Sequence, residues 1–274
     1  MPTWVVIAPR ATRAWRSPLA ARPAESVPPP EGLPWETPHI VRQLKVLLFD
    51  VFGTLVDWRG SLIAAAEDAG ARSRVDAAWP DVVDDWRRAY QPALDRARSD
   101  GEWRNLDSLQ RQTLADVLAG HGVELSREEC ERLVAAWHRL HPWPDTAEGL
   151  ELLRRDYVTA TLSNGHVALL VDLLRFGDLR VDAILSAELA SSYKPDPSVY
   201  LTALRLLATQ PEEAGMVAAH PTDLRAAAAL GLRPFFVSRP LEWGPQGAPA
   251  EPPPLRGLVT ADSLVELAAQ LHAR

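Results

Sequence analysis

The sequence predicts an α/β fold, a parallel β-sheet core with an all-helical domain inserted after its first strand. Two patterns predict this arrangement. Short apolar runs alternate with helical patterns from residue 145 to the C-terminus, which is typical of a parallel sheet covered by helices. A further apolar run at residues 46–49 is separated from that region by a long stretch with helical periodicity only.

The first strand is predicted at residues 46–49, an apolar run that ends directly before Asp50. An uninterrupted apolar run of this length is typical of a strand buried on both faces of a parallel sheet. Gly53 follows closely and permits a tight turn.

The stretch 61–140 is predicted to be helical. Apolar residues recur at helical spacing, as in Leu62, Ile63, Ala66 and Ala69, and no strand pattern interrupts them. We therefore assign 45–60 together with 141–274 to an α/β core domain, and 61–140 to a helical domain.

The remainder alternates between strands and helices. Strands are predicted at 158–162, 181–185, 216–219, 235–237 and 257–260, and helices at 146–155, 167–176, 198–207, 223–230 and 263–272. The Pro-rich stretch 240–254 is predicted to be a surface loop.

Residues 1–44 differ from the rest. Prolines recur between residues 18 and 38, and four arginines but no acidic residue precede Glu25. Although this composition resembles a transit peptide, we favour a disordered extension, or a start codon placed too early, over a targeting signal.

Composition narrows the function. The 274 residues carry a net charge of −7, which argues against a nucleic-acid partner, and no apolar run is long enough for a membrane span. The single cysteine, Cys130, excludes an internal disulfide framework and a cysteine-based zinc site. We expect a cytoplasmic protein that acts on a small molecule.

Polar residues follow several predicted strands. Asp50 follows the first, Ser163 and Asn164 the second, and Asp223 lies just after the strand at 216–219, while Lys194 lies in a loop. Ligands of open parallel sheets bind beyond the carboxyl ends of the strands, so these residues form a candidate site.

Each of these residues also has a structural interpretation. Asp50 suits a nucleophile, a metal ligand or a turn residue. Ser163 and Asn164 suit helix caps, and Asp223 suits the first turn of a helix. Lys194 is one of only two lysines among many arginines, which favours a role that an ammonium alone can fill.

The segments 50–55, 162–165 and 193–197, followed by Asp223, resemble the four ordered motifs of the haloacid dehalogenase superfamily. Within it, the sequence is most similar to the type II 2-haloacid dehalogenases. The resemblance covers about residues 45–274 and implies a Rossmann-like core with a helical cap domain.

Two positions separate the chemistries of this superfamily. Phosphatases carry a second Asp two residues after the nucleophile, where this chain has Phe52, and a magnesium-binding Asp where it has Ala219. A halide leaves without an acid, whereas an alkoxide needs one. The resemblance therefore implies metal-independent hydrolysis of short 2-haloalkanoic acids to 2-hydroxy acids. The alternatives are a Mg²⁺-dependent small-molecule phosphatase and a non-catalytic binding protein.

The resemblance also implies catalytic roles. Asp50 would form an ester with the halogen-bearing carbon, and water would then hydrolyse that ester. Thr54 would hold the Asp50 carboxylate, and Ser163 would bind the substrate carboxylate. Lys194 would counter the anionic charge, and Asp223 would orient Lys194 or the water.

A second group would bind substrate and halide. Arg87 is assigned to the departing halide and Asn164 to the halide site, with Tyr200 near Lys194. Phe52 stands where the family often has Tyr. His220 replaces the usual Asn and is either a base, a halide-site donor or a packed loop histidine.

Further expectations concern the surroundings of the site. The residues Trp58, Trp103, Asn105 and Leu106 either line the pocket or belong to the helical core. The resemblance implies no metal, no cofactor, a small haloacid substrate and a homodimer.

Overall fold

The computed structural model describes residues 43–101 and 103–273. These residues belong to one compact unit. The predicted N-terminal extension, 1–44, lies outside the described residues except for its last two.

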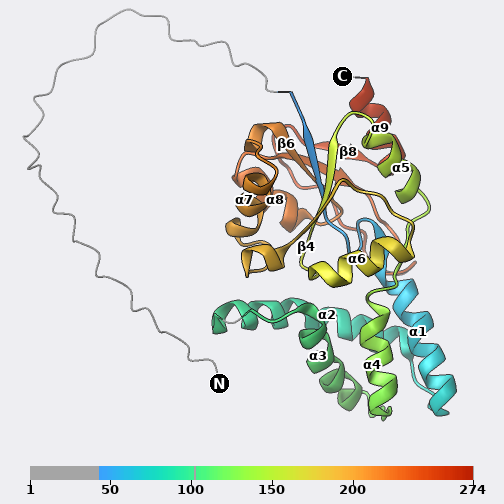
Figure 1. The fold of residues 1–274 in the computed structure, drawn as a ribbon. Coiled ribbons are helices and arrows are strands. Elements are labelled where there is room, and N and C mark those ends of the chain that lie inside the picture. The colour runs from blue at the N-terminus through green and yellow to red at the C-terminus, as the bar shows by residue number, and fades with distance from the viewer. Residues whose placement is uncertain (1–42, 102, 274) are drawn as a thin grey trace, which may run out of the picture. The chain divides into compact units, whose positions relative to one another are not determined.

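The core is a parallel six-stranded sheet in the order β5-β4-β1-β6-β7-β8 (Figure 1). The central strand β1 is completely apolar and pairs with β4 and β6 along its two edges. Its residues Leu47, Leu48 and Phe49 are fully buried. The strands are β1 (Val46–Phe49), β4 (Val158–Ser163), β5 (Ala183–Ser186), β6 (Ala214–Ala218), β7 (Arg233–Val237) and β8 (Val259–Ala261). The predicted α/β fold is confirmed, with strand ends that differ by about two residues.

Helices cover both faces of this sheet. From β1, the chain first moves to β4 and β5 in one direction along the sheet, and then from β5 to β6, β7 and β8 in the opposite direction. Because the crossovers are right-handed, the helices of these two runs lie on opposite faces of the sheet. In Figure 1, α7 and α8 lie on one side of the sheet, and α5 and α9 lie on the other. The helices are α5 (Thr146–Leu153), α6 (Val167–Phe176), α7 (Pro197–Leu206), α8 (Pro221–Ala229) and α9 (Leu264–His272), with the 3₁₀ turns η1 (Ala187–Ala190) and η2 (Pro211–Glu213) between strands.

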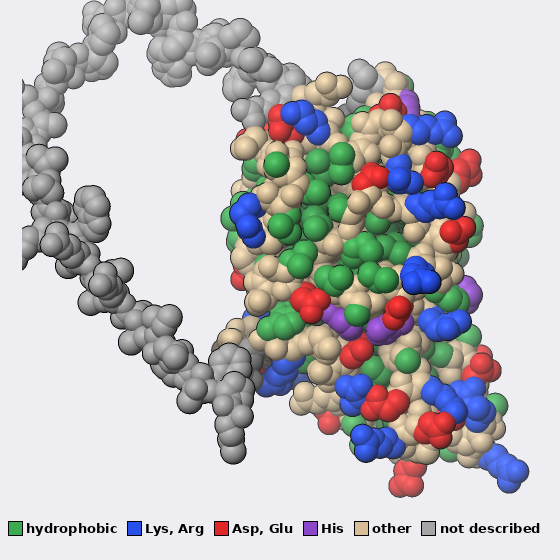
Figure 2. All heavy atoms as spheres, in the orientation of Figure 1, with side chains coloured by type: hydrophobic (Ala, Val, Ile, Leu, Met, Phe, Trp, Pro, Cys, Tyr) green, Lys and Arg blue, Asp and Glu red, His purple; other side chains and the backbone are tan. Residues whose placement is uncertain are grey.

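Four of the helices between β1 and β4, all of them before α5, form an insertion that we call the helical insertion. They are α1 (Trp58–Ser73), α2 (Trp79–Asp100), α3 (Leu106–Gly120) and α4 (Arg127–Ala136). Buried aromatic residues join the insertion to the rest of the chain, since Trp137 packs edge-on against both Trp86 of α2 and Phe52. The surface in Figure 2 carries scattered charges of both signs, and histidine side chains gather where the insertion meets the sheet-bearing part.

The two connections of the insertion pair with each other as a short antiparallel ladder, β2 (Val56–Asp57) with β3 (His141–Pro142). Sequence periodicity did not predict this ladder because each strand has only two residues. Helix α1 begins at Trp58, three residues before the predicted insertion. No helix in the described part of the chain is long and apolar enough to span a membrane.

The start of the insertion depends on a helix cap. The Asp57 carboxylate accepts a hydrogen bond of 2.9 Å from the backbone N–H of Gly60. We expect Asp57→Ala to lower the free energy of unfolding by about 1 kcal/mol, because the first turn of α1 loses this acceptor. Urea unfolding measures the loss, and Asp57→Asn, which keeps an acceptor, is the matched control. Equal losses in both variants would contradict the capping role.

Candidate active site

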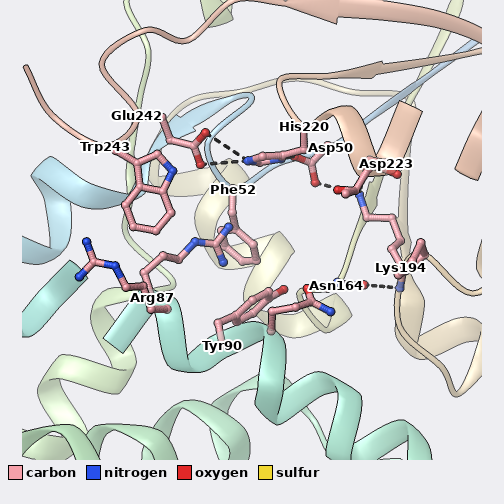
Figure 3. Close-up of a pocket in the computed structure, with 14 residues that line it drawn as sticks. Asp50, Phe52, Arg87, Tyr90, Asn164, Lys194, His220, Asp223, Glu242 and Trp243 are labelled. Carbon is pink, nitrogen blue, oxygen red and sulfur yellow. Dashed lines mark hydrogen bonds and ion pairs between the residues drawn. The ribbon is translucent and has the colours of Figure 1, made fainter. Parts of the chain in front are cut away.

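A small cavity lies beyond the carboxyl end of β1, where the strand order reverses direction (Figure 3). Connections leave this point toward opposite edges of the sheet, which opens a crevice above the central strands. The cavity has a volume of about 350 Å³, which suits a small molecule. Its lining residues include Asp50, Phe52, Arg87, Tyr90, Asn164, Lys194, His220, Asp223, Glu242 and Trp243.

Lys194 joins two carboxylates at the floor of the cavity. Its Nζ lies 2.8 Å from Oδ1 of Asp50 and also donates to Oδ2 of Asp223. All three residues are at least nine-tenths buried. The sequence predicted that Asp50 and Lys194 meet, and the structure brings them into direct contact although 144 positions separate them.

Electrostatics keep Asp50 ionised. Burial favours the neutral acid, but the charges of Lys194 and His220 outweigh it and hold the pKa of Asp50 far below its usual range. Burial likewise works against the Lys194 ammonium, yet Asp223 and Asp50 raise its pKa. The pKa of Asp223 is raised by burial and by the nearby Asp50 charge. At neutral pH, Asp50 is therefore a carboxylate beside an ammonium.

Two hydroxyl groups position these carboxylates. Thr54 donates to Oδ2 of Asp50 at 2.7 Å and accepts from the backbone N–H of Ala219 at 2.9 Å. Tyr200 donates to Oδ1 of Asp223 at 2.5 Å. Neither hydroxyl residue lines the cavity. Both therefore orient reactive groups through hydrogen bonds rather than contact a ligand.

On its other side, Asp50 contacts His220. The His220 Nδ1 lies 2.9 Å from Oδ2 of Asp50, and Nε2 lies 2.9 Å from Oε1 of Glu242. Burial lowers the pKa of His220, but the two carboxylates outweigh it and raise the pKa to about 10. His220 therefore lines the cavity between two carboxylates, which favour its protonated form.

Glu242 was not predicted as a site residue. It lies in the stretch 240–254, which was predicted to be a surface loop, but its side chain is buried and also accepts from Nε1 of Trp58 at 3.0 Å. Gly53 makes room for it, because a Cβ at that position would lie 2.3 Å from Oε1 of Glu242. The signal that could have found it is its place after β7, at the same edge of the sheet as the other strand-end residues.

The helical insertion contributes a cation. The Arg87 guanidinium of α2 lies over the rings of Tyr90, at 4.5 Å, and Trp58, at 5.3 Å. Its Nη1 is buried without a hydrogen-bond partner among residues 43–101 and 103–273. A buried guanidinium nitrogen without a partner on the wall of a cavity is suited to bind an anion there.

Comparisons with known proteins agree with this geometry. The sequence model of the haloacid dehalogenase-like hydrolases matches residues 44–231. The chain belongs to this family. It is 28% identical over 218 residues to (S)-2-haloacid dehalogenase 4A of Burkholderia cepacia, with 77% of this chain and 88% of the relative covered.

Solved structures place the chain more narrowly within the haloacid dehalogenase-like hydrolases. The crystal structure of a defluorinating L-2-haloacid dehalogenase has a TM-score of 0.80 and 37% identity, and covers 84% of this chain and 96% of its own. The structure of another L-2-haloacid dehalogenase has a TM-score of 0.77 and 43% identity. The match covers 83% of this chain and 99% of that dehalogenase. The predicted resemblance to the type II 2-haloacid dehalogenases is confirmed.

Asn164 and Ser163 are neighbours in the sequence, but only Asn164 lines the cavity. Asn164 lines the cavity, and its Oδ1 accepts from the backbone N–H of Lys194 at 2.7 Å, so it also fixes the loop that carries the lysine. Ser163 does not line the cavity. Its Oγ accepts from the backbone N–H of Gly165 and so fixes the turn before α6, whose cap residue is His166. Binding of the substrate carboxylate by Ser163 stays a prediction.

The aromatic and neighbouring residues considered for the pocket have separate outcomes. Trp58 contacts the site through Glu242 and Arg87. Trp103 stacks against Tyr193 with ring centroids 4.6 Å apart, and Asn105 caps α3 by accepting from Ser108. Trp103, Asn105 and the buried Leu106 are not among the residues that line the cavity.

The charge on His220 can be tested directly. We expect its pKa near 10 in the wild-type protein and lower in Glu242→Gln, which removes one of two anionic partners. The pKa in the folded protein exceeds the ordinary value of about 6.5. The ion pairs of His220 therefore stabilise the fold fully below about pH 6.5, and this stabilisation is lost as the pH rises through about 10. NMR titration of the histidine ring protons measures both values. An unchanged pKa in the variant would contradict the assignment.

Proposed function

We propose that this protein hydrolyses the carbon–halogen bond of short 2-haloalkanoic acids, through an ester on Asp50 and without a metal ion. One observation carries the proposal. The Asp50 carboxylate lines the cavity, and the Lys194 ammonium pairs with both Asp50 and Asp223. The names of its relatives, (S)- and L-2-haloacid dehalogenases, support the substrate class.

In the first step, a carboxylate oxygen of Asp50 attacks the C2 atom of the haloacid. A carbon–oxygen bond forms, the carbon–halogen bond breaks, and the halide leaves with the bonding electron pair. No proton is transferred, because halide is a stable anion. This suits Phe52, which occupies the position where an acid would stand and has no proton to donate.

The departing halide needs a cation. Arg87 supplies one, since its buried Nη1 has no hydrogen-bond partner in the described part of the chain. Tyr90 and Trp58 hold the guanidinium in place through their ring faces. A fixed donor that is desolvated before the reaction stabilises the charge that develops on the halogen.

In the second step, water attacks the carbonyl carbon of the ester. His220 takes one water proton and returns it to the leaving oxygen, so the 2-hydroxy acid is released and Asp50 is regenerated with loss of one proton to solvent. Ester formation prepares His220 for this role. It removes the negative charge of one of its two anionic partners, which lowers the pKa of His220 from about 10 and favours the neutral base.

The phosphatase alternative requires that the residues of this site fit a magnesium ion. Mg²⁺ prefers several oxygen ligands in octahedral geometry. Here the two carboxylates of Asp50 and Asp223 already share the ammonium of Lys194, and Ala219 offers no carboxylate. These residues do not fit a magnesium ion, which supports the metal-independent reaction over the phosphatase alternative. The predicted homodimer and cytoplasmic location stay predictions.

Halide release tests the reaction. We expect release from 2-chloropropionate in the presence of EDTA at the same rate as without it. Asp50→Asn should lower the rate by at least a thousandfold, because no nucleophile remains, and Lys194→Met should do so by removing the counter-charge. Chloride is measured by ion chromatography.

Lys45 provides the control for this experiment. It is the other lysine of the chain and forms an exposed ion pair with Glu213 at the opposite end of β1, so Lys45→Met should retain wild-type rates. Activity that requires added Mg²⁺, or phosphate release from phosphate monoesters, would contradict the proposal.

The role of His220 predicts a covalent species. In His220→Gln, we expect the first step to continue while hydrolysis slows, so that the ester on Asp50 accumulates. Mass spectrometry of the intact protein after mixing with 2-chloropropionate would show the mass of one propionate residue. Glu242→Gln should show a smaller accumulation, since the histidine remains. A His220→Gln protein with full turnover would exclude His220 as the base.

A further inference from the structure

A second cluster of reactive side chains lies outside the active site. Asp107, in the first turn of α3, His138, just after α4, and His166, at the start of α6, come together where the helical insertion meets the sheet-bearing part of the chain. We propose that these three residues form a zinc-binding site that ties the insertion to α6. The haloacid chemistry proposed above does not use it.

The distances suit a single ion. One ligand atom from each residue lies within 4.8 Å of the other two. The Nε2 of His138 is 3.2 Å from Oδ1 of Asp107, and the Nε2 of His166 is 3.8 Å from Oδ2. Ligand atoms at zinc bond lengths of about 2.0–2.1 Å in tetrahedral geometry are separated by roughly 3.3 Å. Small side-chain movements would therefore complete the site.

His166 provides an independent observation. It is 6% exposed, and its Nδ1 is buried without a hydrogen-bond partner among the described residues. The 3.8 Å from its Nε2 to Asp107 is too long for a hydrogen bond. A buried imidazole with no hydrogen bond is costly. An ion between its Nε2 and Asp107 would give the ring a strong partner on the side that faces the cluster, whereas the buried Nδ1, on the other side of the ring, would keep no partner among the described residues.

A fourth residue orients the cluster. The Nδ1 of His138 lies 2.8 Å from Oδ2 of Asp172 in α6, which directs the opposite ring nitrogen, Nε2, toward Asp107 and His166. Metal-binding histidines almost always donate their second N–H to a carboxylate or carbonyl in this way. Asp172 therefore has the place of the supporting carboxylate behind a zinc ligand.

Two imidazoles and one carboxylate are a donor set that zinc accepts, with a fourth position left for water. His138 and its partner Asp172 also line a surface pocket of about 470 Å³, which Asp107 and His166 do not line. The ligands come from α3, from the chain after α4 and from α6. Bound zinc would consequently hold the insertion against the N-terminal end of α6. The ligand at that end, His166, lies two residues beyond Asn164 of the active site.

The experiment uses the full-length protein, treated with EDTA and freed of the chelator, with Zn²⁺ alone as the probe. We expect one equivalent of zinc to remain bound after gel filtration and the melting temperature to rise with zinc concentration. Co²⁺ in place of zinc should give the visible absorption of a four-coordinate site. His138→Gln and His166→Gln should lose the equivalent. Asp172→Asn, a largely exposed position, should bind zinc about 10- to 100-fold more weakly.

Two controls separate this site from other zinc ligands. His121→Gln changes a histidine that also pairs with an aspartate, Asp85, but outside the cluster, and should keep the equivalent. His220→Gln should keep it as well, which separates the cluster from the active site. Circular dichroism checks that each variant is folded. Absence of zinc from the wild-type protein, or wild-type binding by folded His138→Gln, His166→Gln and Asp172→Asn, would overturn the proposal.

Discussion

The ammonium of Lys194 between the carboxylates of Asp50 and Asp223 is the interaction on which the active site depends. All three groups are buried, so each charge would be strongly destabilising without the others, and removal of one partner from such a group costs about 3–5 kcal/mol. The same arrangement keeps Asp50 ionised while it remains accessible from the cavity. Stability and reactivity therefore rest on one set of contacts.

Asp50 has a second set of contacts, and the reaction changes its charge. Lys194 contacts Oδ1, while Thr54 and His220 contact Oδ2, so both oxygens are held before substrate arrives. In the reaction proposed above, the carboxylate becomes an ester, so its neighbours would lose an anionic partner. His220 keeps Glu242, which holds the ring in place while its proton affinity falls. This arrangement fits the two successive steps of the proposed reaction, which have opposite charge requirements.

The sequence by itself determined the parallel sheet, the helical insertion and most of the reactive residues. Apolar runs such as 46–49 indicate strands that are buried on both faces of a sheet. Residues that follow the ends of parallel strands lie at one edge of that sheet, so a common site could be predicted for Asp50, Asn164, Lys194 and Asp223. These signals are local or follow from topology. The family motifs added Arg87, although its unpartnered nitrogen is visible only in the fold.

Only the tertiary structure decided the contacts between distant side chains. Glu242 lies 22 positions beyond His220, in a loop without periodicity, and nothing in its neighbours along the chain indicates that a histidine and Trp58 bury it. Ser163 suited either a helix cap or a ligand, and the structure shows its Oγ in contact with Gly165, in the turn before α6. The cluster of Asp107, His138 and His166 likewise depends on how the insertion packs against α6. Sequence patterns report burial and periodicity, whereas side-chain pairing depends on the packing of whole elements.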